Sequence, residues 1–113
     1  MTVTALCIIE SKDAANGIAT QYTASANNNV RTIIDKFTST NYTAGALTLT
    51  VYLVPFGSAA ANSNLVKIKT LAPGECYVWP EVVGHTLNPG DFIATNASAA
   101  TSINIRSSGR ENT

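Results

Sequence analysis

Two nearly identical phrases, Thr70–Glu75 (TLAPGE) and Thr86–Asp91 (TLNPGD), start sixteen residues apart in this sequence. In each phrase, proline sets φ at about −65° at the second position of a turn and glycine supplies a positive φ at the third, which is the pattern of a type II turn. The carboxylate after the glycine is placed to accept backbone N–H bonds within the same turn. The repeat therefore predicts two structural corners of similar geometry, each leading one strand into the next. The corner residues are Pro73, Gly74, Glu75, Pro89, Gly90 and Asp91.

Alternation of apolar and polar residues with a period of two surrounds these corners and predicts strands along most of the chain. The clearest case is residues 46–55 (ALTLTVYLVP), in which Leu47, Leu49 and Val51 share one face. Residues 1–10 are expected to form an N-terminal strand, and residues 107–113 a polar C-terminal tail. Between them, the other expected strands are residues 18–24, 30–40, 64–71, 76–80, 92–96 and 102–106.

The length of 113 residues points to a single domain covering residues 1–113. Eight or nine short strands separated by turn signals predict an all-β fold, namely an antiparallel β-sandwich. Long loops rich in Asn, Ser and Ala are compatible with a jelly roll, whose strands cross between two sheets. This pattern leaves the order of the strands open.

The surface is expected to carry little charge. Charged residues make up 12% of the chain, against about 25% in an average protein, and seven basic side chains balance seven acidic ones. Without a basic stripe to bind phosphates, nucleic acid is not an expected partner. A neutral surface rich in Thr, Ser and Asn fits either a subunit of an assembly or an ordinary β domain with uncharged faces.

The N-terminal residues 1–10 are apolar but have no basic segment and no small-residue cleavage site, so we do not expect a signal peptide. Since no apolar run reaches the ~18 residues of a membrane span, a membrane is not an expected partner either. The two cysteines, Cys7 and Cys76, could pair, but we expect them to be small buried hydrophobic residues.

The sequence contains few candidates for chemistry. Glu75 and Asp91 could approach each other as a carboxylate pair for glycoside hydrolysis or as calcium ligands, but turns of this kind are common structural elements. The chain also resembles cupin-type jelly rolls at these turns, yet it lacks their histidine cluster, since His85 stands alone. We therefore expect no catalytic residue, no metal site and no cofactor, and predict that the protein is not an enzyme.

Two groups of residues are candidates for an interface. Tyr77 and Trp79 occupy alternate positions of one strand and could stack on a sugar, anchor a protein contact, or pack in the core. Residues 3–9 could add to the sheet edge of a neighbouring molecule, or pair within their own sandwich. The candidate interface residues are Val3, Ala5, Cys7, Ile9, Tyr77 and Trp79.

Three stretches resemble small virion proteins of tailed bacteriophages, and the resemblance extends from Ala24 to Glu111. They are residues 48–66 (TLTVYLVPFGSAAANSNLV), 71–93 (LAPGECYVWPEVVGHTLNPGDFI) and 103–111 (INIRSSGRE). The chain looks most similar to the capsid decoration, or cement, proteins of short-tailed phages. That resemblance implies a jelly-roll or sandwich subunit, made in the host cytoplasm, that sits on the capsid exterior as a dimer or trimer and staples neighbouring major capsid subunits.

Tail and tail-fibre accessory proteins share the same β-rich style, so a receptor- or carbohydrate-binding role on a tail is the alternative. That role requires the rings of Tyr77 and Trp79 to be exposed in a groove.

Overall fold

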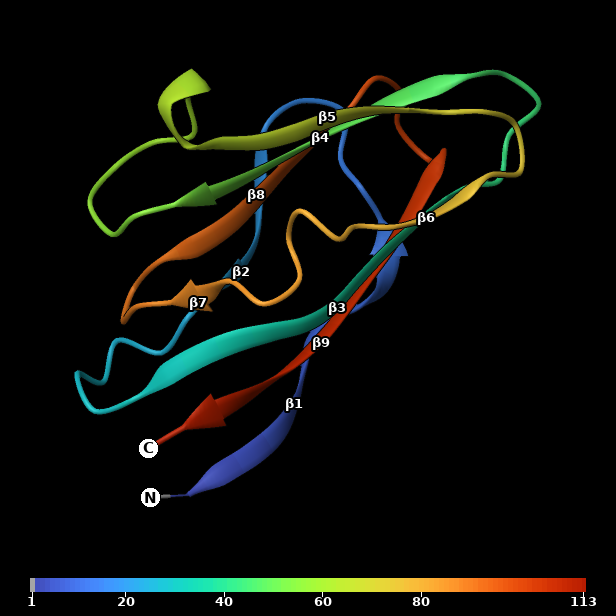
Figure 1. The fold of residues 1–113 in the computed structure, drawn as a ribbon. Helices are drawn as coiled ribbons and strands as arrows, with labels where there is room; N and C mark the ends of the chain where they lie inside the picture. The colour runs from blue at the N-terminus through green and yellow to red at the C-terminus, as the bar shows by residue number, and fades with distance from the viewer. Residues whose placement is uncertain (1) are drawn as a thin grey trace.

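The computed structural model describes residues 2–113, which form nine strands arranged as two antiparallel sheets (Figure 1). This confirms the predicted all-β sandwich. The strands are β1 Val3–Asp13, β2 Ala19–Thr23, β3 Arg31–Asn41, β4 Leu47–Val54, β5 Leu65–Leu71, β6 Cys76–Val78, β7 Thr86–Leu87, β8 Phe92–Ala97 and β9 Ile103–Asn112; one 3₁₀ turn, η1, spans Asn62–Asn64.

The order of the strands is that of a jelly roll. One sheet, called sheet A here, has the order β1-β9-β3-β6, with β7 also paired to β3; the other, sheet B, has the order β2-β8-β4-β5. Because β6 and β7 pair with successive parts of β3, they act as one interrupted strand. Along the chain, eight strands then alternate between the two sheets except at β4 and β5, which follow each other in sheet B and pair there, as in two interlocked Greek keys.

The repeated phrase marks the two crossings on either side of this interrupted strand. The TLAPGE turn leads from β5 in sheet B to β6 in sheet A, and the TLNPGD turn leads from β7 in sheet A back to β8 in sheet B. The two turns lie at opposite ends of the sandwich (Figure 1). The sequence therefore repeats the phrase because the chain makes the same kind of crossing twice.

The core lies between the sheets and contains large apolar side chains from both. Its largest fully buried members are Trp79, Phe37, Ile9, Ile34, Leu49, Leu71, Ile93, Ile103, Ile105, Val51 and Val82. One buried polar side chain, Asn41, ends β3; its amide donates to the carbonyls of Gly45 (2.7 Å) and Leu71 (3.0 Å), and its oxygen accepts from Thr43 N (2.9 Å). These bonds join the end of sheet A to sheet B without leaving the buried amide unpaired.

The C-terminal residues 107–112 are not a polar tail, as the sequence predicted, but the second half of β9. This strand lies in the middle of sheet A, paired with β1 on one side and β3 on the other. Small residues fit there: the buried Ser107 hydroxyl donates to Lys36 O (2.7 Å), and a Cβ on Gly109 would collide with the Ile33 carbonyl oxygen. The prediction was wrong because β9 lies close to its neighbour β3, which leaves room only for small residues at positions such as Gly109. A run of small polar residues in a sequence looks the same as an unstructured tail.

Within residues 2–113, the structure contains no helix that is long and apolar enough to span a membrane.

Candidate interaction surface

The first half of β1 presents three of the predicted interface residues to solvent. The side chains of Val3, Ala5 and Cys7 are exposed on the outer face of sheet A, and Val3 retains 58% of its accessible surface. In the described part of the chain, β1 pairs only with β9, so its other side is an open edge of the sheet. This segment is available to a partner both through its side chains and through its backbone.

Ile9 does not belong to this exposed set, contrary to the sequence prediction. The register of β1 against β9 shifts between Cys7 and Ile9, as in a β-bulge. The shift turns both Ile8 and Ile9 into the core, where they retain 5% and 2% of their surface. Strict alternation therefore places Ile9 on the wrong face, because an extra residue interrupts the period of two.

Trp79 is also excluded from the interface, because it is fully buried. Its indole Nε1 donates to the Ser39 hydroxyl (2.8 Å), and its ring meets those of Phe37 and Tyr77 edge-to-face at centroid distances of 5.9 and 5.3 Å. The chain leaves the strand geometry after Val78, so Tyr77 and Trp79 do not form one exposed ladder. Stacking of a sugar on Trp79 is thereby overturned, and of the three interpretations core packing holds.

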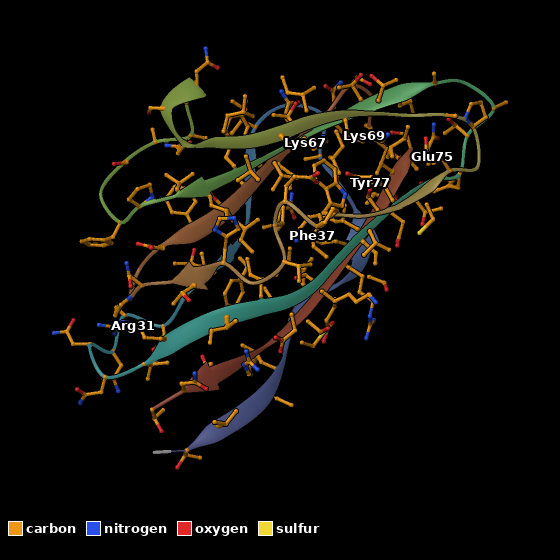
Figure 2. All side chains as sticks on the ribbon, viewed as in Figure 1. Arg31, Phe37, Lys67, Lys69, Glu75 and Tyr77 are labelled. Carbon is orange, nitrogen blue, oxygen red and sulfur yellow. The ribbon has the colours of Figure 1, made fainter. Side chains whose placement is uncertain are left out.

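Tyr77 lies at the rim of the core in a small polar cluster that joins the two sheets (Figure 2). Its hydroxyl donates to the Glu81 carboxylate (3.1 Å), and the Lys69 ammonium lies 4.8 Å from the ring centroid. Lys67 approaches Glu81 (3.5 Å) and Lys69 approaches Glu75 (3.8 Å). The cluster thus ties β5 of sheet B to β6 and the following loop of sheet A through cation–π and ion-pair contacts.

The ionisation of this cluster follows its geometry. Partial burial raises the pKa of the Tyr77 hydroxyl, and its hydrogen bond to Glu81 raises it further. Partial burial alone would raise the pKa of Glu81, but bonds from its own backbone amide and from Tyr77, together with the Lys67 ammonium, lower it on balance. At neutral pH the cluster therefore holds a protonated phenol against an ionised carboxylate.

The Glu75 carboxylate closes the first repeated turn. Gly74 has φ of 75°, and Glu75 N donates to Ala72 O (3.0 Å), as a type II turn requires. One carboxylate oxygen accepts from Ala72 N (2.8 Å), and the turn bonds to the end of β3 through Gly74 N and Asn41 O (2.8 Å). The side chain acts as a brace for the turn.

The Asp91 carboxylate has the same role in the second turn. Gly90 has φ of 82°, and Asp91 N donates to Asn88 O (3.0 Å). Its two oxygens accept from Asn88 N and from Phe56 N, both at 3.0 Å. Asp91 therefore holds the β4–η1 loop against its own turn in addition to closing that turn.

These bonds decide between the two interpretations of the acidic pair. Glu75 and Asp91 belong to turns at opposite ends of the sandwich, so they do not form a carboxylate pair (Figure 1). No group of three or more His, Cys, Asp or Glu side chains lies together within residues 2–113. His85 is exposed, and its backbone carbonyl accepts from Ile34 N (3.1 Å), which secures the segment between β6 and β7.

The two cysteines are neither paired nor buried. Within residues 2–113, Cys7 and Cys76 are both exposed free thiols, so the expectation that they are small buried hydrophobic residues was wrong. Cys7 lies on β1 and Cys76 on β6, which are the two opposite edges of sheet A. Two intervening strands therefore separate them.

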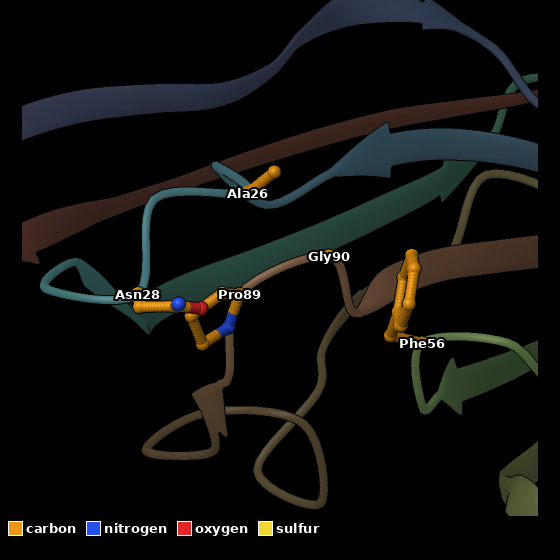
Figure 3. A pocket seen from close by; sticks show the side chains of 5 residues that line it. All are labelled: Ala26, Asn28, Phe56, Pro89 and Gly90. Carbon is orange, nitrogen blue, oxygen red and sulfur yellow. The ribbon is translucent and has the colours of Figure 1, made fainter.

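A shallow hollow lies beside the second turn (Figure 3). It has a volume of about 270 Å³, and Phe56, which is 76% exposed, forms one wall. The Phe56 ring lies so close to Gly90 that any Cβ there would collide with it. The remaining lining residues are Ala26, Asn28 and Pro89. The sequence analysis placed Phe56 in a loop and did not single it out, because no periodic pattern covers that loop.

The fold and this surface define the class of protein: a jelly-roll sandwich with an open edge along β1, in which charged residues make up 12% of the chain. No family model matches the sequence, and no curated protein matches it. Among solved structures, the chain is similar to one described as showing that Bacillus endospore appendages form a novel family of disulfide-linked pili. The TM-score is 0.55 at 14% identity, over 99% of this chain and 88% of that chain.

Two further likenesses are to virus structures. A chain of infectious bursal disease virus, strain Gx, matches with a TM-score of 0.47 at 14% identity, over 97% of this chain and 31% of that chain. A chain of the T13 particle of the same virus matches with a TM-score of 0.44 at 14% identity, over 97% of this chain and 30% of that chain. At these identities the pilus comparison shows a shared fold, and the viral likenesses are more distant still.

Proposed function

We propose that this protein is a non-catalytic structural subunit of a virion, which binds the outside of a phage capsid and staples neighbouring major capsid subunits. The surface carries this proposal. Although only 12% of the residues are charged, seven large apolar side chains are exposed within residues 2–113, and Phe56 at 76% is the most exposed of these. A protein that works as a free monomer is better served by a more charged surface, whereas a subunit covers such side chains on assembly.

The rigidity of the sandwich supports the same role. A staple must transmit load between its attachment points, and here both crossings at the repeated turns are closed by a backbone bond and by a carboxylate. The buried Asn41 and the Tyr77 cluster join the two sheets at a third and a fourth place. Close-packed interiors of this kind deform little under strain.

The shared fold with a pilus subunit adds support of a general kind. That protein is described as part of a disulfide-linked pilus, so the same fold builds a repetitive assembly outside a cell. Since a fold does not by itself imply a function, the likeness favours an assembly role without selecting capsid over tail. The resemblance of residues 24–111 to phage decoration proteins is what selects the capsid exterior.

The proposal is tested by the copy number of this protein in purified virions, measured by quantitative mass spectrometry against the major capsid protein. A copy number comparable with that of the major capsid protein supports a shell lattice. A copy number that is a small fraction of it moves the protein to the tail and refutes the stapling role. Absence from the particle refutes any virion role.

A matched binding measurement distinguishes the capsid exterior from the interior. Purified protein added to particles that lack it is expected to saturate their surface and to raise the temperature at which the shell opens. The same binding measurement with a Phe56→Ala variant tests whether this exposed side chain contacts the capsid. Ile18→Ala makes a similar truncation at a second exposed position. Added protein that leaves the shell-opening temperature unchanged refutes stapling.

A further inference from the structure

The sandwich has four edges at which backbone N–H and C=O groups lack a neighbouring strand. In sheet B the edge strands are β2 and β5, and in sheet A they are β1 on one side and the interrupted β6 and β7 on the other. An unpaired edge is a template on which another strand can add, and proteins protect such edges by shortening them, by bulges or by lysines.

Three of the four edges carry such protection. β6 and β7 have three and two residues, and β2 has five with a register shift between Thr20 and Tyr22. β5 is longer but carries Lys67 and Lys69. Each of these edges therefore resists the addition of a strand.

The first half of β1 has no such protection. The strand spans 11 residues, and its segment Val3–Ile9 contains no charged residue and no proline. Its pairing with β9 runs without interruption from Val3 to Cys7. Of the four edges, this one is open to another strand.

The direction of its free backbone groups follows from the pairing next to it. Thr2 and Thr113 exchange both backbone bonds, Thr2 N to Thr113 O (3.2 Å) and Thr113 N to Thr2 O (2.9 Å). In an antiparallel pair such doubly bonded positions alternate with unbonded ones. It follows that the N–H and C=O groups of Val3, Ala5 and Cys7 point away from β9, towards the open edge.

We propose that this edge pairs with the same edge of a second copy of the chain, antiparallel and centred on Ala5. Ala5 then faces the partner's Ala5, and Val3 faces the partner's Cys7, which gives about six backbone hydrogen bonds in three doubly bonded pairs. The two A sheets join into one continuous sheet across a two-fold axis.

Several observations favour a second copy as the occupant. The segment is uncharged and the chain has a net charge of zero, so two copies do not repel one another. Arg110, which lies opposite Ala5 on β9, is already paired with Asp35 (3.6 Å). An antiparallel pair of identical strands satisfies both edges at once and closes with two-fold symmetry, whereas pairing with the short β6 edge would leave open ends.

The bulge limits the length of the contact. After Cys7 the register shifts, and beyond Ile9 the strand carries Glu10, Lys12 and Asp13. The contact is therefore short, and a short interface is weak. We expect a dimer with a dissociation constant in the micromolar range, which a subunit present in many copies on a surface can still use. The inference deepens the proposed structural role and rests on it for its setting.

Cysteine cross-linking with oxidised glutathione tests the register, in a Cys76→Ser background. Ala5→Cys combined with Cys7→Ser is expected to form a covalent dimer, because facing residues of such a pair lie within disulfide range. Val3→Cys is expected to cross-link when Cys7 is retained and to form no covalent dimer with Cys7→Ser, since two Val3 positions would lie about 14 Å apart. Cross-linking of Val3→Cys with Cys7→Ser, or a failure of Ala5→Cys to cross-link with Cys7→Ser, overturns the proposal.

Sedimentation equilibrium of the full chain tests the dimer without cross-links. Ala5→Lys, which places two ammonium groups opposite each other, is expected to raise the dissociation constant at least tenfold. Ala5→Pro removes an N–H that makes no bond to β9 and is expected to do the same while preserving the fold. A wild-type protein that is monomeric at every concentration overturns the proposal, as does a dimer that both variants leave unchanged.

These outcomes are separate from those of the virion copy number. A monomeric wild-type protein with a high copy number on the shell refutes the β1 dimer and retains the structural role. A protein that dimerises through β1 but is absent from the virion refutes the structural role and retains the β1 dimer.

Discussion

The buried hydrogen bond between Trp79 and Ser39 gives the sharpest test of the structure, because it separates a core tryptophan from a binding-site tryptophan. Trp79 retains 0% and Ser39 1% of their accessible surface, and the bond between Nε1 and Oγ is 2.8 Å long. In Ser39→Ala the indole N–H remains buried without an acceptor, and water has no access to replace it. Such an unpaired donor costs about 1–3 kcal/mol.

For a chain of 113 residues, this loss corresponds to a fall in the melting temperature of about 4 °C per kcal/mol. Trp79→Phe is also destabilising, since it removes part of the ring and leaves the Ser39 hydroxyl without its hydrogen-bond donor. The double variant is expected to be more stable than the sum of the two single changes by about 1 kcal/mol, because neither polar group is left alone.

The assay is urea unfolding followed by far-ultraviolet circular dichroism, because Trp79 is the one tryptophan and its fluorescence is lost in Trp79→Phe. Ser108→Ala is the matched control, since it makes the same change at an exposed position of β9 and is expected to stay within about 0.5 kcal/mol of wild type. The reasoning is refuted if Ser39→Ala behaves like Ser108→Ala and the coupling in the double variant is zero.

Three more results are expected. Gly74→Ala is expected to lower the free energy of unfolding by about 1–2 kcal/mol, because of its positive φ alone. Gly90→Ala is expected to lower it by more, because its Cβ also meets the Phe56 ring, and adding Phe56→Ala is expected to remove this extra loss. Chemical denaturation measures both. Gly109→Ala costs about 3 kcal/mol or more, seen as a lower melting temperature, because a Cβ meets the backbone of β3. The fold lowers the pKa of Glu81, so its ionised carboxylate stabilises the protein fully at pH above the unfolded pKa near 4.5. This stabilisation is lost as the pH falls through the lower pKa of the folded state. In Glu81→Gln the melting temperature is therefore expected to decline less steeply in acid. Equal costs at the two turn glycines, a tolerated Gly109→Ala, or an unchanged acid decline in Glu81→Gln would each contradict the corresponding contact.

The repeated phrase was informative because a turn is a local event. Proline and glycine restrict φ at their own positions, and the acidic residue bonds within three residues of itself, so four consecutive letters suffice to define the corner. The same holds for the strand at residues 46–55, whose alternation the structure realises as β4. Sequence patterns predicted the structure correctly wherever the residues that make the contacts are close together in the chain.

The candidate interface was predicted less well, for an identifiable reason. Val3, Ala5 and Cys7 are exposed as a surface strand requires, but Ile9 is displaced by a bulge and Trp79 by the loop that follows β6. Both departures depend on partners distant in sequence: β9 for the bulge, and Ser39 for the indole. Nothing within a few residues of either position signals them.

The sequence by itself determined an all-β chain, its two corners and its low share of charged residues, because these depend on propensities and on composition. Tertiary structure alone decided the strand order, the place of residues 107–112 at the centre of sheet A, and the exposure of both cysteines. Tertiary structure alone also decided which edge of the sandwich stays open. Whether an edge has a neighbour depends on the pairing of strands up to about a hundred residues apart. That pairing is made by backbone N–H and C=O groups, which are the same in nearly every residue, so the sequence does not mark which strands will pair.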